Sequence, residues 1–293
     1  MVNPIADGFR RITNRVGEAF TKASRTSASH GAGDPRTSYT PSAAEQEMQA
    51  RRLVSEHRMT KKLPPHNNDV FIMRSQDNKV NVYKPASGEK FGEMDWIPHV
   101  QGELAKRELG AFRMDQLFGF GRVPPGALID GTRAPHGAGF VQQFVKLKRG
   151  VKKWNKYSEL HQQQVAVLHY VIGNADGHHE NYRPKDHGDG RPNSEDDLVA
   201  FDHGYSFPEK PDAARGGDHF RNLSDSVRFY EGKRPLREDV LSAVDAVRPE
   251  QVRSALGDIG LSDSAIEGVL TRLAAVKKHR MIPDWDLSYS WDL

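Results

Sequence analysis

The sequence has no cysteine, no long apolar run and little net charge. Without cysteine the chain can form no disulfide and no thiolate site, which fits a reducing cytoplasm. No stretch approaches the roughly 18 to 20 apolar residues that a membrane-spanning helix needs, and the N-terminus lacks the apolar core of a secretory signal. We therefore expect a cytoplasmic protein. A net charge of only +3 disfavours a general nucleic-acid binder, so we expect no nucleic-acid partner.

The basic residues are concentrated near the N-terminus. Residues 1–62 carry 11 Lys or Arg against 6 Asp or Glu. In "PIADGFRRITNRVGEAFTKASR" the apolar residues recur at helical spacing, interrupted by arginine and lysine: Ile5, Phe9, Ile12, Val16 and Phe20. The pattern predicts a basic amphipathic helix. Such a helix over residues 5–25 can lie on an anionic membrane surface, and it can equally dock on its own domain or on a partner.

A Ser-, Thr-, Gly- and Pro-rich stretch, residues 24–44, follows this helix and predicts a flexible linker. After it, "AAEQEMQARRLVSEHRM" predicts a second helix. The next segment, "DVFIMRSQDNKVNVYKP", contains two β-prone runs, 70–74 and 79–83, around a polar turn, and predicts a hairpin.

The rest of the chain changes from mixed to helical character. A periodic apolar pattern predicts a helix that ends at Gly119, and "VPPGALID" and "GFVQQFVKL" predict further strands. Beyond Gly150 we expect a helix in "KYSELHQQQVAVLHYVI", then helices over roughly 236–247, 249–257 and 263–280. For the last of these, Ser264 to Glu267 suggests a capping box. The pattern predicts an α+β protein with a β-rich first lobe, a mainly helical second lobe and a cleft between them.

Ionisable residues are concentrated where the helix after Gly150 ends, in "VIGNADGHHENYRP". Asp176 and Asn181 have the D-x-x-x-x-N spacing of a kinase catalytic loop. In that loop the carboxylate accepts the proton of an attacking hydroxyl, and the amide oxygen binds a metal that bridges phosphates.

Two further segments add groups of the same kind. The apolar run "DLVAF" delivers Asp202 before His203-Gly204, and a carboxylate there suits Mg²⁺. Lys84 ends the second run of the hairpin, where an ammonium can pair with phosphates. Each motif alone is weak, but together, in this order, they predict a phosphotransferase site.

These residues also resemble a known family. "NADGHHENY" and "VAFDHGYSFP" are similar to the catalytic and metal-binding segments of the phosphatidylinositol 3-/4-kinase superfamily. The closer likeness is to its type II 4-kinase branch and related actinobacterial kinase-like proteins, with HipA-type kinases more distant. "VYKPASGEK", "LAKRELGAF", "FGFGRVPPG" and "GAGFVQQFV" extend the resemblance over roughly residues 70–210.

The resemblance implies a two-lobed protein-kinase-like fold and a role for each matching residue. Lys84 would bind phosphates and Glu108 would orient it, with Glu103 on the same predicted helix as a competing partner. Asp176 would be the catalytic residue, and Asn181 and Asp202 would bind metal. The backbone of the hinge would contact adenine at Gln143, Phe144 and Val145.

The sequence departs from the family at three places, one of which is a polar insertion over residues 185–197. Gly177 stands where many relatives carry a basic residue after the catalytic Asp, and the hairpin turn "RSQDNK" contains no glycine. A zinc site built from the histidines around His169, His178 and His203 ranks lower, because their spacing matches no familiar zinc site.

We therefore predict three regions: a helix and linker over 1–44, an N-lobe over 45–150 and a helical C-lobe over 151–293. The expected activity is transfer of the γ-phosphoryl group of ATP, with Mg²⁺ or alternatively Mn²⁺, to an acceptor hydroxyl. A protein or peptide acceptor is favoured over an inositol lipid, because the second half shows no obvious apolar insertion loop. A pseudokinase and an AMP-transferring enzyme are the rival interpretations.

Overall fold

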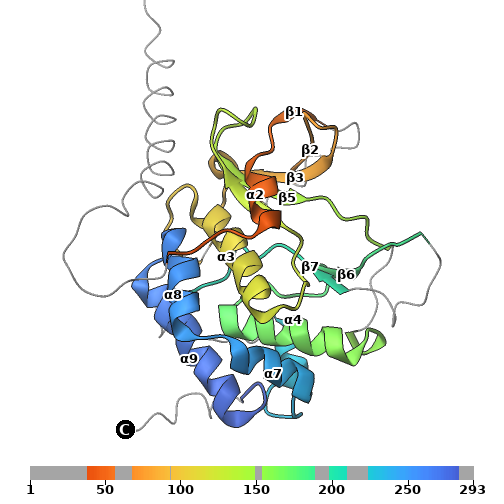
Figure 1. The fold of residues 1–293 in the computed structure, drawn as a ribbon, viewed down its shortest axis with the longest axis vertical. Coiled ribbons are helices and arrows are strands. Elements are labelled where there is room, and N and C mark those ends of the chain that lie inside the picture. The colour runs from red at the N-terminus through yellow and green to blue at the C-terminus, as the bar shows by residue number, and fades with distance from the viewer. Residues whose placement is uncertain are drawn as a thin grey trace, which may run out of the picture.

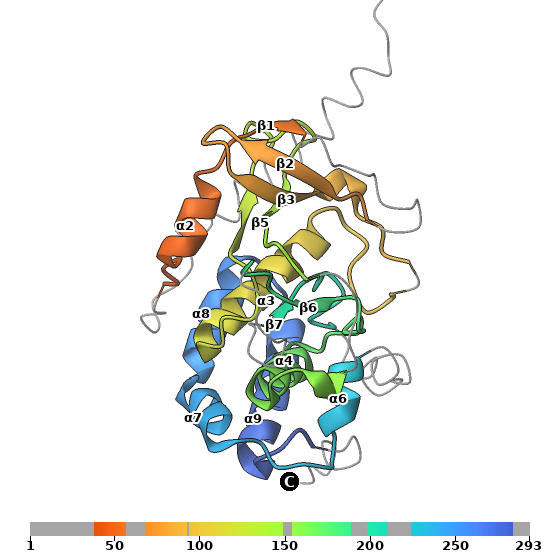
Figure 2. The same ribbon diagram turned by 90° about the vertical axis from the view of Figure 1, so that its right-hand side faces the viewer.

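The computed structural model describes residues 38–56, 68–92, 94–148, 154–188, 198–209 and 224–283. The predicted basic helix over 5–25 and most of the predicted linker lie outside these residues. No helix in the described ranges has the length and apolar character that crossing a membrane requires. Figures 1 and 2 show a sheet at one end of the molecule and helices at the other. The predicted α+β class with two lobes is confirmed.

The first lobe is built on one antiparallel sheet. Its strands lie in the order β1-β2-β3-β5-β4, and its elements are α2 (Ala43–Gln49), β1 (Leu53–Glu56), β2 (Phe71–Ser75), β3 (Val80–Pro85), the short 3-10 helix η1 (Ala86–Gly88), α3 (Glu103–Phe118), β4 (Gly126–Ile129) and β5 (Gly139–Gln143). A small apolar cluster that includes Met73, Tyr83 and Val141 lies against the sheet.

The predicted hairpin is confirmed by the register of β2 and β3, in which Ile72 lies opposite Val82. Its turn contains no glycine, and Asn78 supplies the left-handed backbone instead, with φ of 64°. Asparagine tolerates this region better than most residues. The Ser75 amide then donates to the Lys79 carbonyl at 3.0 Å and closes the turn. β3 is therefore held centrally between β2 and β5.

Helix α3 lies where the two lobes meet (Figure 2). It packs against β4 and β5 of the sheet and against helices of the second lobe. Gly119 ends the helix in the left-handed conformation, with φ of 68°, as the sequence predicts. Its side chains Leu109, Phe112 and Phe118 belong to the main apolar core, which continues through the second lobe. Side chains on α3 can thus contact residues of either lobe.

The second lobe is mainly helical, and the predicted helices are confirmed. Its elements are η2 (Trp154–Lys156), α4 (Glu159–Ile172), β6 (Tyr182–Pro184), β7 (Leu198–Ala200), α6 (Asp225–Tyr230), α7 (Glu238–Ala246), α8 (Pro249–Asp258) and α9 (Asp263–His279). Strands β6 and β7 form a separate two-stranded antiparallel sheet. This small sheet joins the segment of Asp176 and Asn181 to the segment of Asp202.

The helix expected in "AAEQEMQARRLVSEHRM" is shorter than predicted. It ends at Gln49, and the chain continues as strand β1. Ser55 and Glu56 lie opposite Arg74 and Met73 of β2, and Leu53 is buried in the cluster against the sheet. Pairing with an otherwise open sheet edge outweighs the helical pattern of this short segment.

The predicted capping box at the start of the last helix is also wrong. Ser262 is the N-cap, and its hydroxyl accepts from the Ala265 amide at 3.2 Å. Ser264 is the second residue of the helix, and its hydroxyl donates to the Glu209 carbonyl. Glu267 forms an ion pair with Arg253 on α8. The sequence offers two serines here, and the fold selects the earlier one.

Candidate active site

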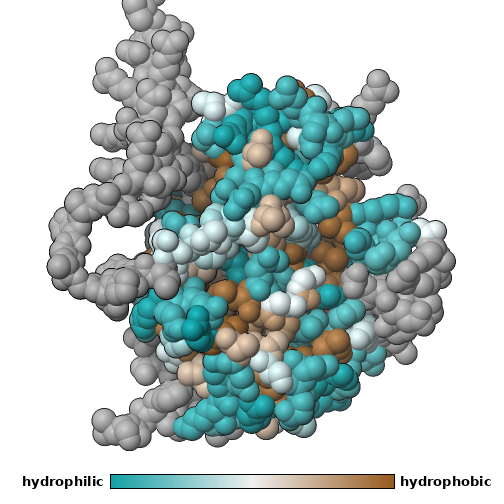
Figure 3. Space-filling view, in the orientation of Figure 1, coloured by the Kyte–Doolittle hydropathy of each residue, from teal (hydrophilic) through white to brown (hydrophobic). Residues whose placement is uncertain are grey.

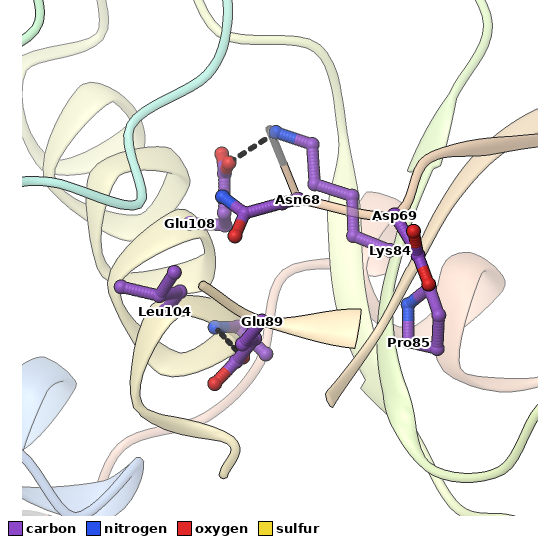
Figure 4. Close-up of a pocket in the computed structure, with 8 residues that line it drawn as sticks. Asn68, Asp69, Lys84, Pro85, Glu89, Leu104 and Glu108 are labelled. Carbon is purple, nitrogen blue, oxygen red and sulfur yellow. Dashed lines mark hydrogen bonds and ion pairs between the residues drawn. The ribbon is translucent and has the colours of Figure 1, made fainter. Parts of the chain in front are cut away.

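Lys84 lies near the end of the central strand β3 and reaches toward α3. Its side chain is only 14% exposed, and its ammonium forms ion pairs with Glu108 and, at 2.8 Å, with Asp202 Oδ1. Figure 4 shows the Lys84 side chain directed at Glu108 across the gap between sheet and helix. Burial lowers the pKa of Lys84, but Asp202 and Glu108 outweigh burial and raise it above its ordinary value. The lysine is therefore charged.

The structure pairs Lys84 with Glu108, not with Glu103. Glu108 lies on the face of α3 that looks toward β3, and its second oxygen accepts from the His203 backbone amide at 3.1 Å. Glu103 binds Lys106 at 2.6 Å and Arg107 instead. Glu108 therefore joins the lysine of the first lobe to the segment of Asp202 in the second.

Asp202 lies two residues beyond the end of β7, where the backbone takes a left-handed conformation. Its φ is 66°, in a region that is uncommon for non-glycine residues but that aspartate adopts more readily than most. The ammonium of Lys84 lowers the pKa of Asp202, against the opposite effect of burial. The carboxylate is therefore ionised, and it can offer oxygen to a metal ion.

Asp176 and Asn181 are brought together by the turn that follows α4. The helix ends at Gly173, which is left-handed, and Asn174 Oδ1 then accepts from the Asp176 amide at 2.9 Å. Asn181 Nδ2 donates to the Asp176 carbonyl at 2.7 Å and to Asp176 Oδ2 at 3.3 Å. Because Nδ2 is used in this way, Oδ1 is the atom of Asn181 that could bind a metal.

The catalytic-loop segment is joined to the metal-site segment by the backbone. The Phe201 amide donates to the Asn181 carbonyl at 3.0 Å, and the Ala175 amide donates to the Tyr205 carbonyl at 2.9 Å. Burial and, to a smaller extent, the negative charge of Asp202 together raise the pKa of Asp176 to about 6. Two carboxylates that repel each other in a partly buried site favour a cation between them.

The site residues fit a divalent metal held partly by phosphate. Asp202 and Asn181 present carboxylate and amide oxygens, which Mg²⁺ and Mn²⁺ both accept. Within the ranges that the structure describes, no three His, Asp or Glu side chains gather into a metal site of their own. Two protein ligands are few for a stable metal, so a phosphate ligand would complete the shell.

Gly177 is required by packing, which the sequence alone did not indicate. A Cβ at this position would lie 2.6 Å from Ser224 Oγ and 2.7 Å from His169 Nδ1. His169 is buried and donates to or accepts from Ser226 Oγ at 2.9 Å. A side chain at this position has no space in this chain, because His169 of α4 and Ser224 at the start of α6 approach the loop closely.

The predicted adenine segment leaves β5 at the junction of the lobes. Gln143 donates its amide to the Pro125 carbonyl at 2.8 Å, and Phe144 donates to the Val80 carbonyl at 3.3 Å. Both amides are thus used within the sheet. The groups that could face adenine are therefore the carbonyls of this segment and the Val145 amide. The Phe144 side chain is 43% exposed.

Glu89 belongs to the site, although the sequence assigned it no role. It lines a small recess, partly open to solvent, together with Lys84 and Glu108. Other lining residues come from the chain before β2 and from the start of α3, namely Asn68, Asp69, Leu104 and Ala105. In the sequence, Glu89 stands out only because it lies in the segment "VYKPASGEK" that resembles the kinase family. Its hydrogen-bond partners are distant in sequence, so the sequence alone indicated no role for it.

Comparison with known proteins gives a fold-level likeness only. No protein-family model matches the sequence, and no curated protein matches it. Two similar solved structures are crystal structures of the Golgi casein kinase. One is 15% identical, covers 80% of this chain and 74% of that chain, and has a TM-score of 0.49. The other, with Mn/ADP bound, is 15% identical, covers 84% and 75%, and has a TM-score of 0.47. At these values the likeness carries no argument about activity, which has to come from the site.

Proposed function

We propose that this protein is a phosphotransferase that transfers the γ-phosphoryl group of ATP to an acceptor hydroxyl. The observation that carries the proposal is the convergence of Lys84, Glu108, Asp176, Asn181 and Asp202 from four separate segments. The ion pairs of Lys84 join the two lobes at this point. Such a set, in the chain order expected for a protein-kinase-like fold, is what phosphoryl transfer requires.

Each side chain has a part in the transfer. Lys84 neutralises phosphate charge, and Glu108 holds the lysine in place. Asp176 orients the acceptor hydroxyl and accepts its proton as the oxygen attacks the γ-phosphorus. The bond from the γ-phosphorus to the bridging oxygen of the β-phosphate breaks, and ADP leaves. Asn181 holds Asp176 by its Nδ2 group. The Asp176 pKa of about 6 leaves the carboxylate mostly ionised at neutral pH yet basic enough to accept a proton.

Asp202 and Asn181 would hold the metal, and Mg²⁺ or Mn²⁺ would supply positive charge to the phosphates. In the structure Asp202 Oδ1 binds Lys84 at 2.8 Å, so Oδ2 is the oxygen best placed to take a metal. The hinge from Gln143 to Val145 would contact the adenine base.

For the acceptor we propose a hydroxyl of a protein or peptide. Within the described residues, the exposed large apolar side chains are Val54, Val100 and Phe144, all in the first lobe. On the face shown in Figure 3, hydrophilic side chains predominate and apolar ones occur in small groups. A lipid kinase would need an apolar surface or anchor to reach its substrate. An inositol-lipid acceptor would therefore depend on the basic helix that the sequence predicts over residues 5–25.

The proposal is tested by calorimetric titration of Mg²⁺ and ATP into three proteins. We expect the unaltered chain to bind, Asp202→Ala to lose most of the affinity and Asn181→Ala to lose less, since a carboxylate compensates more charge than an amide. Unchanged affinity in Asp202→Ala would remove this residue from the metal site.

Mass spectrometry of protein incubated with Mg²⁺ and ATP distinguishes a phosphotransferase from an AMP-transferring enzyme and from a pseudokinase. A phosphoryl group and an adenylyl group add different masses, and a pseudokinase adds none.

A further inference from the structure

Helix α3 begins without a side-chain cap of its own. Its N-cap is Gly102, in a left-handed conformation with φ of 95°, and a glycine offers no side chain to the amides of the first turn. Those amides have no partner within the helix and need an acceptor from elsewhere. A carboxylate is favourable there because the helix N-terminus is the positive end of its dipole.

Glu89 supplies this acceptor from a distant segment. Glu89 Oε2 accepts from the Gly102 amide and Oε1 accepts from the Ala105 amide, both at 2.8 Å. Figure 4 shows Glu89 at the start of α3, in the recess that also contains Lys84 and Glu108. The half-buried Glu89 side chain is directed at these amides, and burial raises its pKa to about 7, against the lowering effect of the amides.

The connection from Lys84 to Glu89 is short and stiff. Pro85 fixes its own backbone angle, and η1 follows at once. The Ala86 amide donates to the Ala138 carbonyl at 2.9 Å, and the Gly88 carbonyl accepts from the Asp69 amide at 3.0 Å. A Cβ at Gly88 would lie 2.4 Å from Asp69 Cβ, so this segment is tightly packed. We therefore expect a displacement of Glu89 to shift the backbone at Lys84 as well.

These contacts link Glu89 to Lys84 in two ways, through the backbone between them and through helix α3. Glu89 fixes the first turn of α3, α3 carries Glu108 just beyond that turn, and Glu108 binds Lys84. We propose that Glu89 is a positioning residue that sets the placement of Glu108 relative to Lys84, and through them the phosphate-binding geometry. The role in catalysis rests on the proposed function, whereas the effect on the ion pair does not.

The test compares three variants of the full-length protein. Glu89→Ala removes both bonds to α3, and Glu89→Gln keeps one acceptor oxygen while placing an amide N–H against the other donor. Ser262→Ala is the control for loss of a helix cap as such, because it removes the one side-chain bond to the first turn of α9, a helix outside the site.

The first measurement needs no nucleotide. An amine-acylating reagent labels lysines at a rate that depends on their exposure and pairing, and peptide mass spectrometry reads each site. We expect Lys84 labelling to rise about tenfold in Glu89→Ala, by an intermediate factor in Glu89→Gln, and not at all in Ser262→Ala. Lys79, whose side chain is 53% exposed, is the internal reference and should not change.

The second measurement is kcat/KM for Mg²⁺ and ATP. We expect a loss of about tenfold in Glu89→Ala, a smaller loss in Glu89→Gln, and a change within about twofold in Ser262→Ala. If Lys84 labelling and kcat/KM in Glu89→Ala match those of Ser262→Ala, Glu89 is a structural cap only and the inference is overturned. If Glu89→Ala does not fold, the same comparison with Glu89→Gln decides. An unaltered protein that neither binds nor turns over ATP would refute the proposed function, and the labelling would still decide the placement of Lys84.

Discussion

The ion pair between Glu45 of α2 and Arg113 of α3 gives the sharpest stability prediction. Both side chains are buried, at 0% and 2% exposure, and their closest atoms are 2.6 Å apart. Arg113 also donates to the Ala255 carbonyl at 2.7 Å and binds Asp258 at 2.8 Å. The guanidinium therefore joins α2, α3 and α8, and the ring of Tyr39 covers it at 3.9 Å.

Replacing Glu45 by Gln should leave a buried cation that is only partly compensated. Removing one partner of a buried pair typically costs about 3–5 kcal/mol. Asp258 remains, but its side chain is 46% exposed and compensates less. We therefore expect Glu45→Gln to lower the free energy of unfolding by roughly 3 kcal/mol, or to lower Tm by about 6–12 °C for a chain of this size.

Urea denaturation followed by circular dichroism measures this loss. The control is Glu267→Gln, which removes the exposed Arg253–Glu267 pair and should cost less than about 1 kcal/mol. The double change Glu45→Leu with Arg113→Met should recover at least half of the loss, because apolar residues of similar volume often replace a buried pair without cost. A loss in Glu45→Gln no larger than in Glu267→Gln would contradict the reasoning.

Two further predictions concern pH and the active-site loop, and a third the N-terminus. Burial raises the pKa of Asp115 to about 6 from its ordinary value of 3.8, so the folded state binds this proton more tightly than the unfolded state. The contribution of protonated Asp115 to the free energy of unfolding is full below pH 3.8 and is lost as pH rises through 6, a loss of roughly 3 kcal/mol. The free energy of unfolding of Asp115→Asn should therefore depend less on pH between 4 and 6 than that of the unaltered protein. Gly177→Ala should lower Tm and turnover together, because the new Cβ would meet Ser224 and His169; a fully stable, fully active variant would show that the loop has more space than described. Liposome sedimentation tests the amphipathic helix: full-length protein should bind anionic vesicles and a chain lacking residues 1–37 should not, and equal binding by both would refute a membrane contact there.

Local patterns in the sequence predicted much of the fold. Alternating β-prone runs around a polar turn gave the hairpin that carries Lys84, and apolar residues at helical spacing gave α3, α4 and the last three helices. Strand β1 was missed because its four residues follow a helix with no turn signal. Strand β6 was missed because it has only three residues and its partner β7 lies beyond a polar insertion in the sequence.

The candidate site could be predicted only where spacing carries the information. Asp176 and Asn181 are close in sequence, and their spacing requires a tight loop. Whether Glu108 or Glu103 pairs with Lys84 depends on which face of α3 packs toward β3. The sequence did not determine that face. Glu89 and Gly177 act through distant partners, Ala105 and Ser224, so no local pattern could assign their roles.

The most direct test of the central claim is steady-state phosphoryl transfer by Asp176→Asn, measured as ATP hydrolysis while no acceptor is known. The change is nearly isosteric, keeps an oxygen that can bond Asn181, and removes the base and its charge. We expect the fold and the affinity for Mg²⁺ and ATP to remain nearly unchanged and turnover to fall by about 10²- to 10⁴-fold. Turnover above about half of that of the unaltered protein would show that Asp176 is not the base, and would contradict the phosphotransferase mechanism proposed for this site.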